Sequence, residues 1–271
     1  MKKCYIQNLA LNVTDNCNLE CGHCLRGNRC MRNMSDEVIS TTLSQVIGIG
    51  NLSINGGEPT LAVDRIEKIV DYIISNNILV EEFTTTINGT VYSEELLRLF
   101  KVMDEYINDS DTMAMFTISF DKYHIDEIKK LGLFEEYKEN ITKYSESKYF
   151  LGLRDLYVKL FREGRASDLD NGLTVPLRPM PVFITYAGND RKYNRKNGLC
   201  NIGPLVTIGT KGNYTECDAS LEHQDTIYNY GNVFDETIED NILRRGILYT
   251  NPKKMERKAV KVLKKYATYE K

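Results

Sequence analysis

Apolar strand-like runs alternate with amphipathic segments along the first half of the chain, and this alternation constrains the fold more than any other feature. In residues 63–76, for example, Ile66, Ile69, Val70 and Ile73 recur at helical spacing on one face. We expect strands at 5–13, 51–55, 79–87 and 113–120, and helices from Ser35 and over 63–76, 93–106 and 124–145. Apolar strands that are each followed by a helix favour parallel β/α units.

The remaining sequence completes the predicted fold. Two further strands near 149–161 and 179–187 would bring the total to six strand–helix units before residue 188. We therefore predict an α/β fold, a partial (β/α)6 TIM-like barrel, rather than a closed eight-stranded barrel. A polar stretch at 188–198 suggests two domains, a barrel at 1–190 and an extension at 191–271. In the extension we expect a hairpin at 204–217, a helix at 235–246 and a basic helix at about 253–268.

Charge and hydropathy exclude several classes of function. The formal net charge of −3 provides no basic field for binding nucleic acid. No apolar run is long enough to cross a bilayer, so we expect no membrane partner. Gln7, Asn8 and Asn12 interrupt the first apolar stretch, which argues against a signal peptide. We therefore predict a cytoplasmic protein.

Four of the seven cysteines lie between residues 17 and 30, which suggests metal or redox chemistry rather than disulfides. Cys17, Cys21 and Cys24 follow the first predicted strand in a CxxxCxxC spacing. Three thiolates on one loop can bind one face of an iron–sulfur cluster and leave one iron open for chemistry. Two alternatives remain: a zinc site with a fourth ligand from elsewhere, as in a regulatory or interaction protein, or cysteines without a metal.

The cysteine motif and a second motif together resemble the radical S-adenosylmethionine (SAM) superfamily. His23 precedes the last cysteine, where that family commonly has an aromatic residue or histidine, and Gly56-Gly57-Glu58-Pro59 resembles its GGE motif. The resemblance implies a [4Fe–4S] cluster on the three cysteines and SAM bound at Gly56, Gly57 and Glu58. Glycines let the backbone approach a ligand, and Glu58 can accept from an ammonium group. The alternative is a turn with Pro59 at a first helical position.

Two further predicted strands end in residues that fit the same family. The stretch from Thr84 to Thr90, which includes Asn88-Gly89, resembles its TNG segment, and the stretch from Ser119 through His124 resembles its S-x-D-x-y-H segment. The resemblance places Asn88 and Ser119 along SAM and makes Asp121 a catalytic candidate, since β/α barrels place their sites at these strand ends. A simple turn at Asn88 and a helix cap at Asp121 are the alternatives. Arg165 is a candidate partner for the SAM carboxylate, or else a packing or surface arginine.

The C-terminal part resembles the SPASM or twitch extensions of radical SAM enzymes. The resemblance rests on Gly164-Arg165-Ala166, on Cys200 and Cys217, and on the Tyr230-Gly231-Asn232 segment. Such extensions hold auxiliary clusters, but no cysteine follows Cys217. Cys200 and Cys217 are therefore a candidate auxiliary site that lacks ligands, and we predict a single cluster. Cys30 is a candidate hydrogen-atom donor or a simple loop thiol.

The implied function is reductive cleavage of SAM to a 5′-deoxyadenosyl radical that takes a hydrogen atom from a substrate. We expect a peptide or protein substrate, with a small-molecule dehydrogenase, epimerase or carbohydrate modifier as the alternative. A flavodoxin or ferredoxin is the expected electron donor. Such an enzyme would be a cytoplasmic oxidoreductase with a [4Fe–4S] cluster and SAM as its cofactors.

Overall fold

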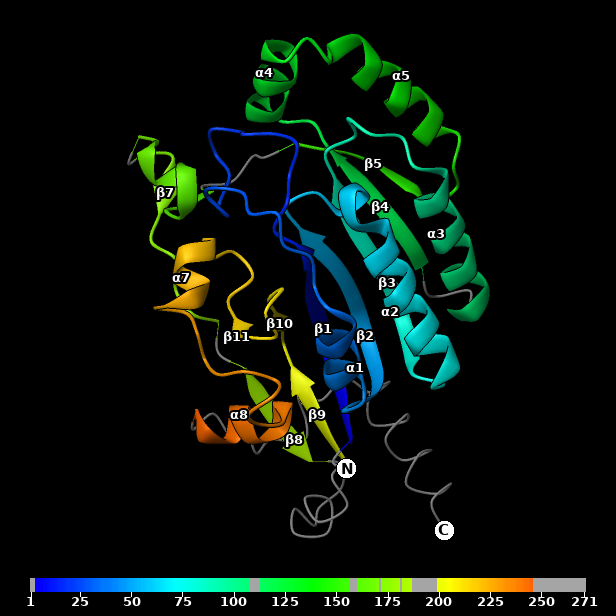
Figure 1. Cartoon of the computed structure of the whole chain (residues 1–271), viewed down its shortest axis with the longest axis vertical. Helices are drawn as coiled ribbons and strands as arrows, with labels where there is room; N and C mark the ends of the chain where they lie inside the picture. The colour runs from blue at the N-terminus through cyan, green and yellow to red at the C-terminus, as the bar shows by residue number, and fades with distance from the viewer. Residues whose placement is uncertain are drawn as a thin grey trace.

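The computed structural model describes residues 3–107, 113–155, 160–170, 172–180, 182–186 and 199–245. Its centre is a sheet in which five parallel strands, β1 to β5, lie side by side in chain order (Figure 1). Their bounds are Lys3–Thr14, Val46–Gly56, Leu79–Ile87, Met113–Ser119 and Phe150–Arg154. This mostly parallel sheet, with helices between successive strands, confirms the predicted α/β fold of the partial-barrel type.

Helices α1 (Asp36–Leu43), α2 (Val63–Ser75) and α3 (Glu94–Ile107) connect the first four strands. The expected cap of α1 is present, because the Ser35 side chain accepts a hydrogen bond from the Val38 amide. The apolar face predicted for α2, which includes Ile66 and Ile73, is fully buried. Figure 1 shows α2 and α3 running alongside β2, β3 and β4, where they cover the apolar side of the sheet.

The single helix expected over 124–145 is two helices. α4 (Lys122–Lys130) and α5 (Phe134–Ser145) are separated at Gly132, which has a φ of +73°. A left-handed residue cannot continue a right-handed helix, and glycine adopts this conformation without steric cost. The prediction of one continuous helix was therefore wrong at this glycine.

The sixth parallel position of the sheet is filled from the C-terminal part of the chain. β9 (Leu199–Gly203) and β10 (Val206–Ile208) pair in parallel with β1, one after the other along its length. The strand expected near 179–187 is β8 (Phe183–Tyr186), which is antiparallel to β9 and pairs with no other strand of the described chain. Its assignment as the sixth barrel strand was therefore wrong.

Shorter elements complete the described chain. The run expected near 149–161 divides into β5 and β6 (Leu160–Phe161), and β6 pairs with β7 (Thr174–Val175) in a separate two-stranded sheet. The predicted hairpin is present as β10 and β11 (Tyr214–Thr215). The short helices are η1 (Pro59–Ala62), η2 (Gly164–Asp168), α7 (Leu221–Asp225) and α8 (Ile238–Arg244). The predicted boundary at 188–198 and the helix at 253–268 lie outside the described residues.

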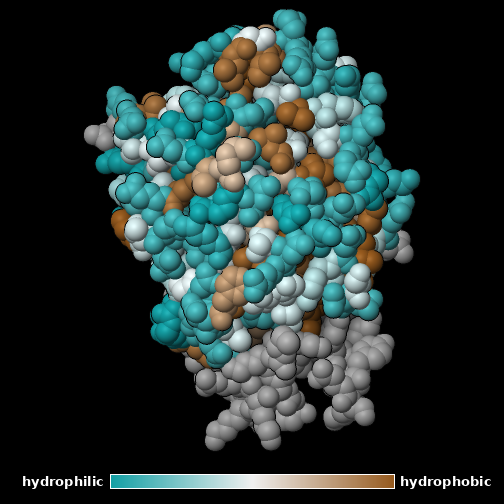
Figure 2. Space-filling model, in the orientation of Figure 1, coloured by the Kyte–Doolittle hydropathy of each residue, from teal (hydrophilic) through white to brown (hydrophobic). Residues whose placement is uncertain are grey.

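The central strands alternate between an apolar and a polar side. On β2, Leu52 and Ile54 are fully buried, whereas Asn51, Ser53 and Asn55 alternate with them and are half-buried. The face of the molecule shown in Figure 2 is mostly hydrophilic, with apolar side chains in separate groups. Within the described chain, no helix is both long enough and apolar enough to cross a membrane.

Candidate active site

A cavity of about 250 Å³ lies at the carboxyl ends of the parallel strands. Its walls come from the loop after β1, the turn after β2 and the ends of β3, β4 and β5. Nine of the sequence-predicted residues line it: Cys17, Cys21, Cys24, Gly57, Glu58, Asn88, Ser119, Asp121 and Arg165. The structure thus brings together groups that lie up to 148 positions apart in the sequence.

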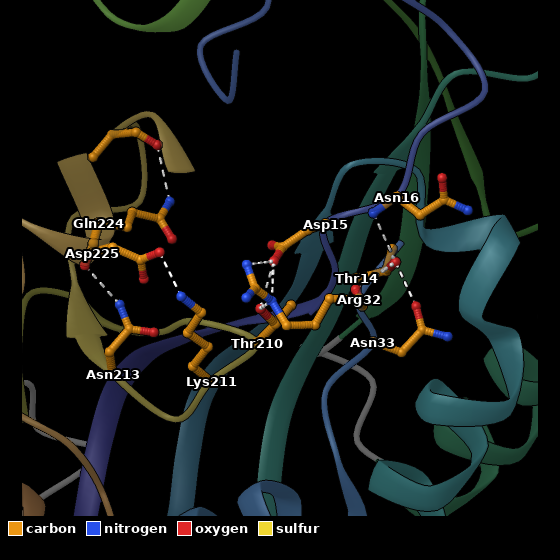
Figure 3. A network of polar contacts seen from close by, with 11 residues as sticks. Thr14, Asp15, Asn16, Arg32, Asn33, Thr210, Lys211, Asn213, Gln224 and Asp225 are labelled. Atoms are coloured by element: carbon orange, nitrogen blue, oxygen red, sulfur yellow. Dashed lines mark hydrogen bonds and ion pairs between the residues drawn. The ribbon is translucent and has the colours of Figure 1, made fainter. Parts of the chain in front are cut away.

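The loop that carries the three cysteines is fixed at both of its ends (Figure 3). The carboxylate of Asp15 accepts hydrogen bonds from Arg32 Nε at 2.8 Å and from Thr210 Oγ1 at 2.6 Å. Beside this network, Thr14 Oγ1 donates to Asn33 Oδ1 at 2.6 Å. The start of the loop, its end and the C-terminal segment are therefore held by one buried carboxylate.

The environment of the cysteines disfavours thiolates unless a cation is present. Burial, together with the nearby Glu58 and Cys24, raises the pKa of Cys17 to about 12. Burial and the neighbouring Cys17 and Cys24 also raise the pKa of Cys21 above its usual value. A bound metal cluster would supply the positive charge that stabilises these thiolates, so binding would release protons. The donor set and its shared cavity therefore fit an iron–sulfur cluster.

His23 also lines the cavity, and it belongs to a group of three residues with the spacing needed to hold a single metal ion. The ligand atoms of Cys21, His23 and His124 all lie within 4.8 Å of one another. Burial lowers the pKa of His23 to about 4, and its Nδ1 is buried without a partner among the described residues. A single ion needs its ligands close together, whereas a cluster spreads three thiolates over three irons. A single ion and a cluster would both need Cys21 as a ligand, so the site can hold only one of them.

The GGE turn packs directly against the start of the cysteine loop. The amide of Gly57 donates to Thr14 O and that of Glu58 donates to Asn16 O, both at 2.8 Å. A Cβ atom on Gly57 would lie 2.2 Å from Asn16 O, so only glycine fits there. Gly56 does not line the cavity, and a Cβ there would meet Thr14 O at 2.6 Å. Gly56 therefore contributes through close packing against the strand end.

Glu58 joins the ends of β2 and β3. Its Oε1 accepts from the Thr60 amide at 3.1 Å and from Thr60 Oγ1 at 2.6 Å, and its Oε2 accepts from the Asn88 amide at 2.7 Å. Burial raises the pKa of Glu58, and these hydrogen bonds partly oppose that rise. The sequence suggested a ligand for an ammonium group, but it gave no indication that the same carboxylate holds two strand ends together.

Asn88 and Asp121 also make the local contacts expected of a simple turn and of a helix cap. Asn88 Oδ1 accepts from the amide of Thr90, and its Nδ2 donates to Asn18 Oδ1 at 2.8 Å. Asp121 caps α4 by accepting from the amides of Tyr123 and His124. Burial opposes ionisation of Asp121, but the hydrogen bond and charge of His124 outweigh this effect and lower its pKa. Both residues therefore line the cavity in fixed orientations.

Arg165 is bonded to the cysteine loop. Its Nε donates to Cys21 O at 2.9 Å, its Nη1 donates to Gly27 O at 2.5 Å, and its amide donates to Cys24 O at 2.9 Å. Gly164, at a φ of +52°, lies so close to this loop that a Cβ would be 2.4 Å from Gly27 N. The guanidinium thus holds loop carbonyls, a role that the sequence did not suggest.

The remaining cysteines do not line the cavity. Cys30 is exposed on the loop. Cys200 is fully buried, with its Sγ 3.2 Å from that of Cys4 near the start of β1. Cys217 lies near the opposite end of the sheet, where its Sγ is 3.7 Å from Asn55 Nδ2. The structure therefore does not bring Cys200 and Cys217 together.

Family comparison decides the class of the site. The model of the radical SAM superfamily matches residues 11–158, which is more than half of the chain. The chain belongs to this superfamily. Radical SAM enzymes use a [4Fe–4S] cluster and SAM, so the predicted cofactors and the prediction of an enzyme are confirmed. Membership also favours the cluster over a single zinc ion.

More specific relatives cover only part of the chain. An uncharacterised protein of Methanocaldococcus jannaschii is 30% identical over 106 residues, which make up 36% of each chain. GTP 3′,8-cyclase of Clostridium perfringens is 25% identical over 177 residues, covering 61% of this chain and 51% of that enzyme. The chain therefore spans about half or less of the length of these curated relatives.

Solved structures show a more distant likeness. Native anSMEcpe with bound AdoMet and a peptide has a TM-score of 0.47 at 15% identity, covering 87% of this chain and 79% of that one. Streptococcus suis SuiB bound to its precursor peptide has a TM-score of 0.40 at 13% identity, covering 88% of this chain and 64% of that one. Likeness at this level carries no argument about substrate.

Arg154 lines the cavity but was missed in the sequence, whereas Thr86 and His124, which also line it, belong to the two stretches that resemble the family. Arg154 is the last residue of β5, and its Nη1 donates to Thr86 Oγ1 at 3.3 Å. Applying the strand-end rule to the fifth strand, as to the third and fourth, would have identified it.

Proposed function

We propose that this radical SAM enzyme holds its cluster through Cys17, Cys21 and Cys24 and removes a hydrogen atom from a peptide or protein substrate. The observation that supports this site is the single cavity shared by the three cysteines, Glu58 and the ends of β3 and β4. A [4Fe–4S] cluster held there would pass one electron from an external donor to SAM and so supply the 5′-deoxyadenosyl radical. A flavodoxin or ferredoxin is the proposed donor of that electron.

The side chains of the cavity have distinct proposed roles. Glu58 accepts from the ammonium group of SAM, and the Gly57 backbone lets that group approach closely. Asn88 and Ser119 line the part of the cavity proposed to hold SAM. Arg165 keeps the cysteine loop in place by donating hydrogen bonds to the carbonyl groups of that loop. Asp121 Oδ2 is hydrogen-bonded to His124 Nδ1 at 2.5 Å and thereby orients the imidazole of His124 at the cavity. Fixed groups of this kind position a reacting atom and exclude competing reactions.

A peptide or protein is our first choice of substrate because residues 162–245 resemble the extensions of radical SAM enzymes that act on peptides, proteins or small sugars. A small-molecule substrate is the second candidate, because the curated relatives with a named activity are GTP 3′,8-cyclases. For the chain itself we propose a barrel at 1–190 and an extension at 191–271. The extension contributes β9 and β10 to the barrel sheet.

Anaerobic reconstitution tests the proposed site. The protein is loaded with iron and sulfide, reduced with dithionite and supplied with SAM, and 5′-deoxyadenosine is measured by mass spectrometry. We expect about four irons per chain and release of 5′-deoxyadenosine. A reconstituted chain that holds iron but never yields 5′-deoxyadenosine would contradict the proposal.

A further inference from the structure

A group of polar residues that the proposed cofactor site does not use lies beside the cavity. It consists of Asn12, Arg26, Asn55, Cys217 and Asp218, and we call it the Arg26 group. Arg26 follows Leu25, which lines the cavity. Arg154 also lines the cavity and stabilises the charged form of Asp218. The Arg26 group is therefore a neighbour of the place where SAM is proposed to bind.

The sheet itself sets the position of this group. Asn12 and Asn55 are register partners on β1 and β2, so their side chains emerge side by side from the same face of the sheet. Asn55 Nδ2 contacts Cys217 Sγ, and Arg26 Nη2 donates to Asn12 Oδ1 at 2.6 Å. Residues from two strands, the cysteine loop and the C-terminal segment thus converge at one point.

Two buried donors of the group have no partner in the described part of the chain. They are Asn12 Nδ2 and Arg26 Nη1, and Asn12 is fully buried. Buried donors are rarely left unpaired, because burial removes their water without replacing the hydrogen bond. Both belong to side chains already joined by a hydrogen bond, so one oxygen-rich group could satisfy both.

The charges around the group favour an anion. Arg26 and Arg154 both act on the one carboxylate of the group, Asp218, and burial disfavours the charged form of that carboxylate. A second carboxylate, Glu216, also acts on Cys217, but it accepts hydrogen bonds from the Met180 amide and from the hydroxyl of Tyr230. A guanidinium binds planar oxyanions through paired N–H donors and stays charged when half-buried.

We propose that the Arg26 group is a substrate subsite that receives an oxyanion, a carboxylate or a phosphate, through Arg26 and Asn12. This inference rests on the proposed function, since it places the subsite beside the proposed SAM pocket. A carboxylate would come from an acidic side chain or the C-terminus of a peptide, whereas a phosphate would come from a small phosphorylated molecule. The subsite therefore bears directly on the choice between the two substrate candidates.

Cys217 provides a reporter within the group, and Cys30 provides an internal reference. Cys217 is half-buried and Cys30 is exposed on the same protein. The reconstituted holoenzyme is alkylated anaerobically with iodoacetate or iodoacetamide, and labelling of each cysteine is followed by mass spectrometry. The iodoacetate-to-iodoacetamide rate ratio at Cys217 is divided by the same ratio at Cys30. We expect this double ratio to be about tenfold above one, because an anion is concentrated at the subsite.

Variants distinguish an oxyanion site from general reactivity. The double ratio should fall to about one in Arg26→Gln, remain high in Arg26→Lys and stay unchanged in Arg65→Gln, which alters an arginine on α2. Asn12→Asp supplies a second test, because its carboxylate would form an ion pair with Arg26 and neutralise the charge. The double ratio should therefore also fall in this variant. Iron content and 5′-deoxyadenosine release, measured on each variant, show separately whether the cofactor site is intact.

Competition with simple anions identifies the type of oxyanion. Malonate, inorganic phosphate and chloride are compared at equal ionic strength for their ability to slow alkylation of Cys217. Slowing by malonate alone supports a carboxylate, and slowing by phosphate alone supports a phosphorylated substrate. A double ratio near one in a wild-type holoenzyme that cleaves SAM overturns the subsite and leaves the proposed function intact. Absence of labelling by both reagents also overturns it, because a substrate could not enter.

Discussion

The two sets of cysteines in this chain behave in opposite ways on folding. Cys17, Cys21 and Cys24 lie on one loop and line one cavity. Cys200 contacts Cys4 near the start of β1, whereas Cys217 contacts Asn55 at the end of β2. Close spacing on a single loop brings ligands together, whereas ligands on two different strands meet only if the sheet places them at the same end. The predictions below test this contrast.

The largest effect is expected from the loop cysteines. Cys21→Ala should abolish iron retention and 5′-deoxyadenosine release, because two thiolates cannot hold the cluster with one iron left open. Iron analysis and mass spectrometry after reconstitution measure both quantities. Cys30→Ala, on the same loop but outside the cavity, is the matched control and should retain both. Full iron content in the Cys21→Ala variant would remove Cys21 from the ligand set.

A smaller effect is expected at Glu58. Glu58→Gln removes the charge that faces the ammonium group of SAM. The NH2 group of the new side chain would also face one of the backbone N–H groups from which the carboxylate now accepts a hydrogen bond. A hydrogen bond to a charged group contributes about 1.5–3 kcal/mol, so SAM should bind about ten- to a hundredfold more weakly. Equilibrium binding to the reconstituted enzyme measures this change.

Thr60→Val separates ligand binding from the structural role of Glu58. This variant removes the 2.6 Å hydrogen bond from Thr60 Oγ1 and leaves the carboxylate in place. We expect it to lower stability by about 1 kcal/mol with little change in SAM affinity. If both variants weaken SAM binding equally, Glu58 acts only by holding the strand ends.

The next effect concerns Arg165, which links the C-terminal half of the chain to the cysteine loop. Arg165→Gln should leave the carbonyls of Cys21 and Gly27 without their guanidinium partner. Each hydrogen bond to a charged group is worth about 1.5–3 kcal/mol, so we expect iron to be lost to a chelator about tenfold faster. The rate of loss of cluster absorbance is the measurement.

Arg154→Gln is the control for this prediction. Arg154 also lines the cavity, but its guanidinium donates to Thr86 and not to the cysteine loop. It should leave the rate of iron loss unchanged. If Arg165→Gln weakens SAM binding while iron is retained normally, the original prediction of a SAM carboxylate partner is supported instead.

Much of the fold was accessible from the sequence because its signals are local. The Ser35 cap, the apolar face of α2 and the alternation of β3 depend on neighbours within a few residues. The pairing of β9 and β10 with β1 could not be predicted, because it joins segments almost 200 residues apart. A strand's periodicity indicates that it belongs to a sheet but does not identify its partner.

The candidate site shows the same division. Strand-end position was enough to place Asn88, Ser119 and Asp121 at one cavity. The double role of Glu58 was not predictable, because its partner is the backbone amide of Asn88, which any residue would supply. The role of Arg165 was not predictable either, because its partners are backbone carbonyl oxygens. Every residue has a backbone carbonyl, so such partners cannot be recognised from the sequence. Sequence motifs therefore located the site but not the contacts that hold it.

The smallest effect is expected from the separated cysteines. Cys200→Ala together with Cys217→Ala should leave about four irons per chain and normal SAM cleavage, because these thiols cannot share a cluster from opposite ends of the sheet. Cys200 is fully buried against Cys4, so the double variant should lose about 1 kcal/mol of stability through the small cavity it creates. Iron analysis and thermal unfolding of the same sample separate these two consequences. Iron near eight per chain in the unaltered protein, falling by about half in the double variant, would show a second cluster. That result would require further ligands and would make the two sets of cysteines alike in function despite their different placement.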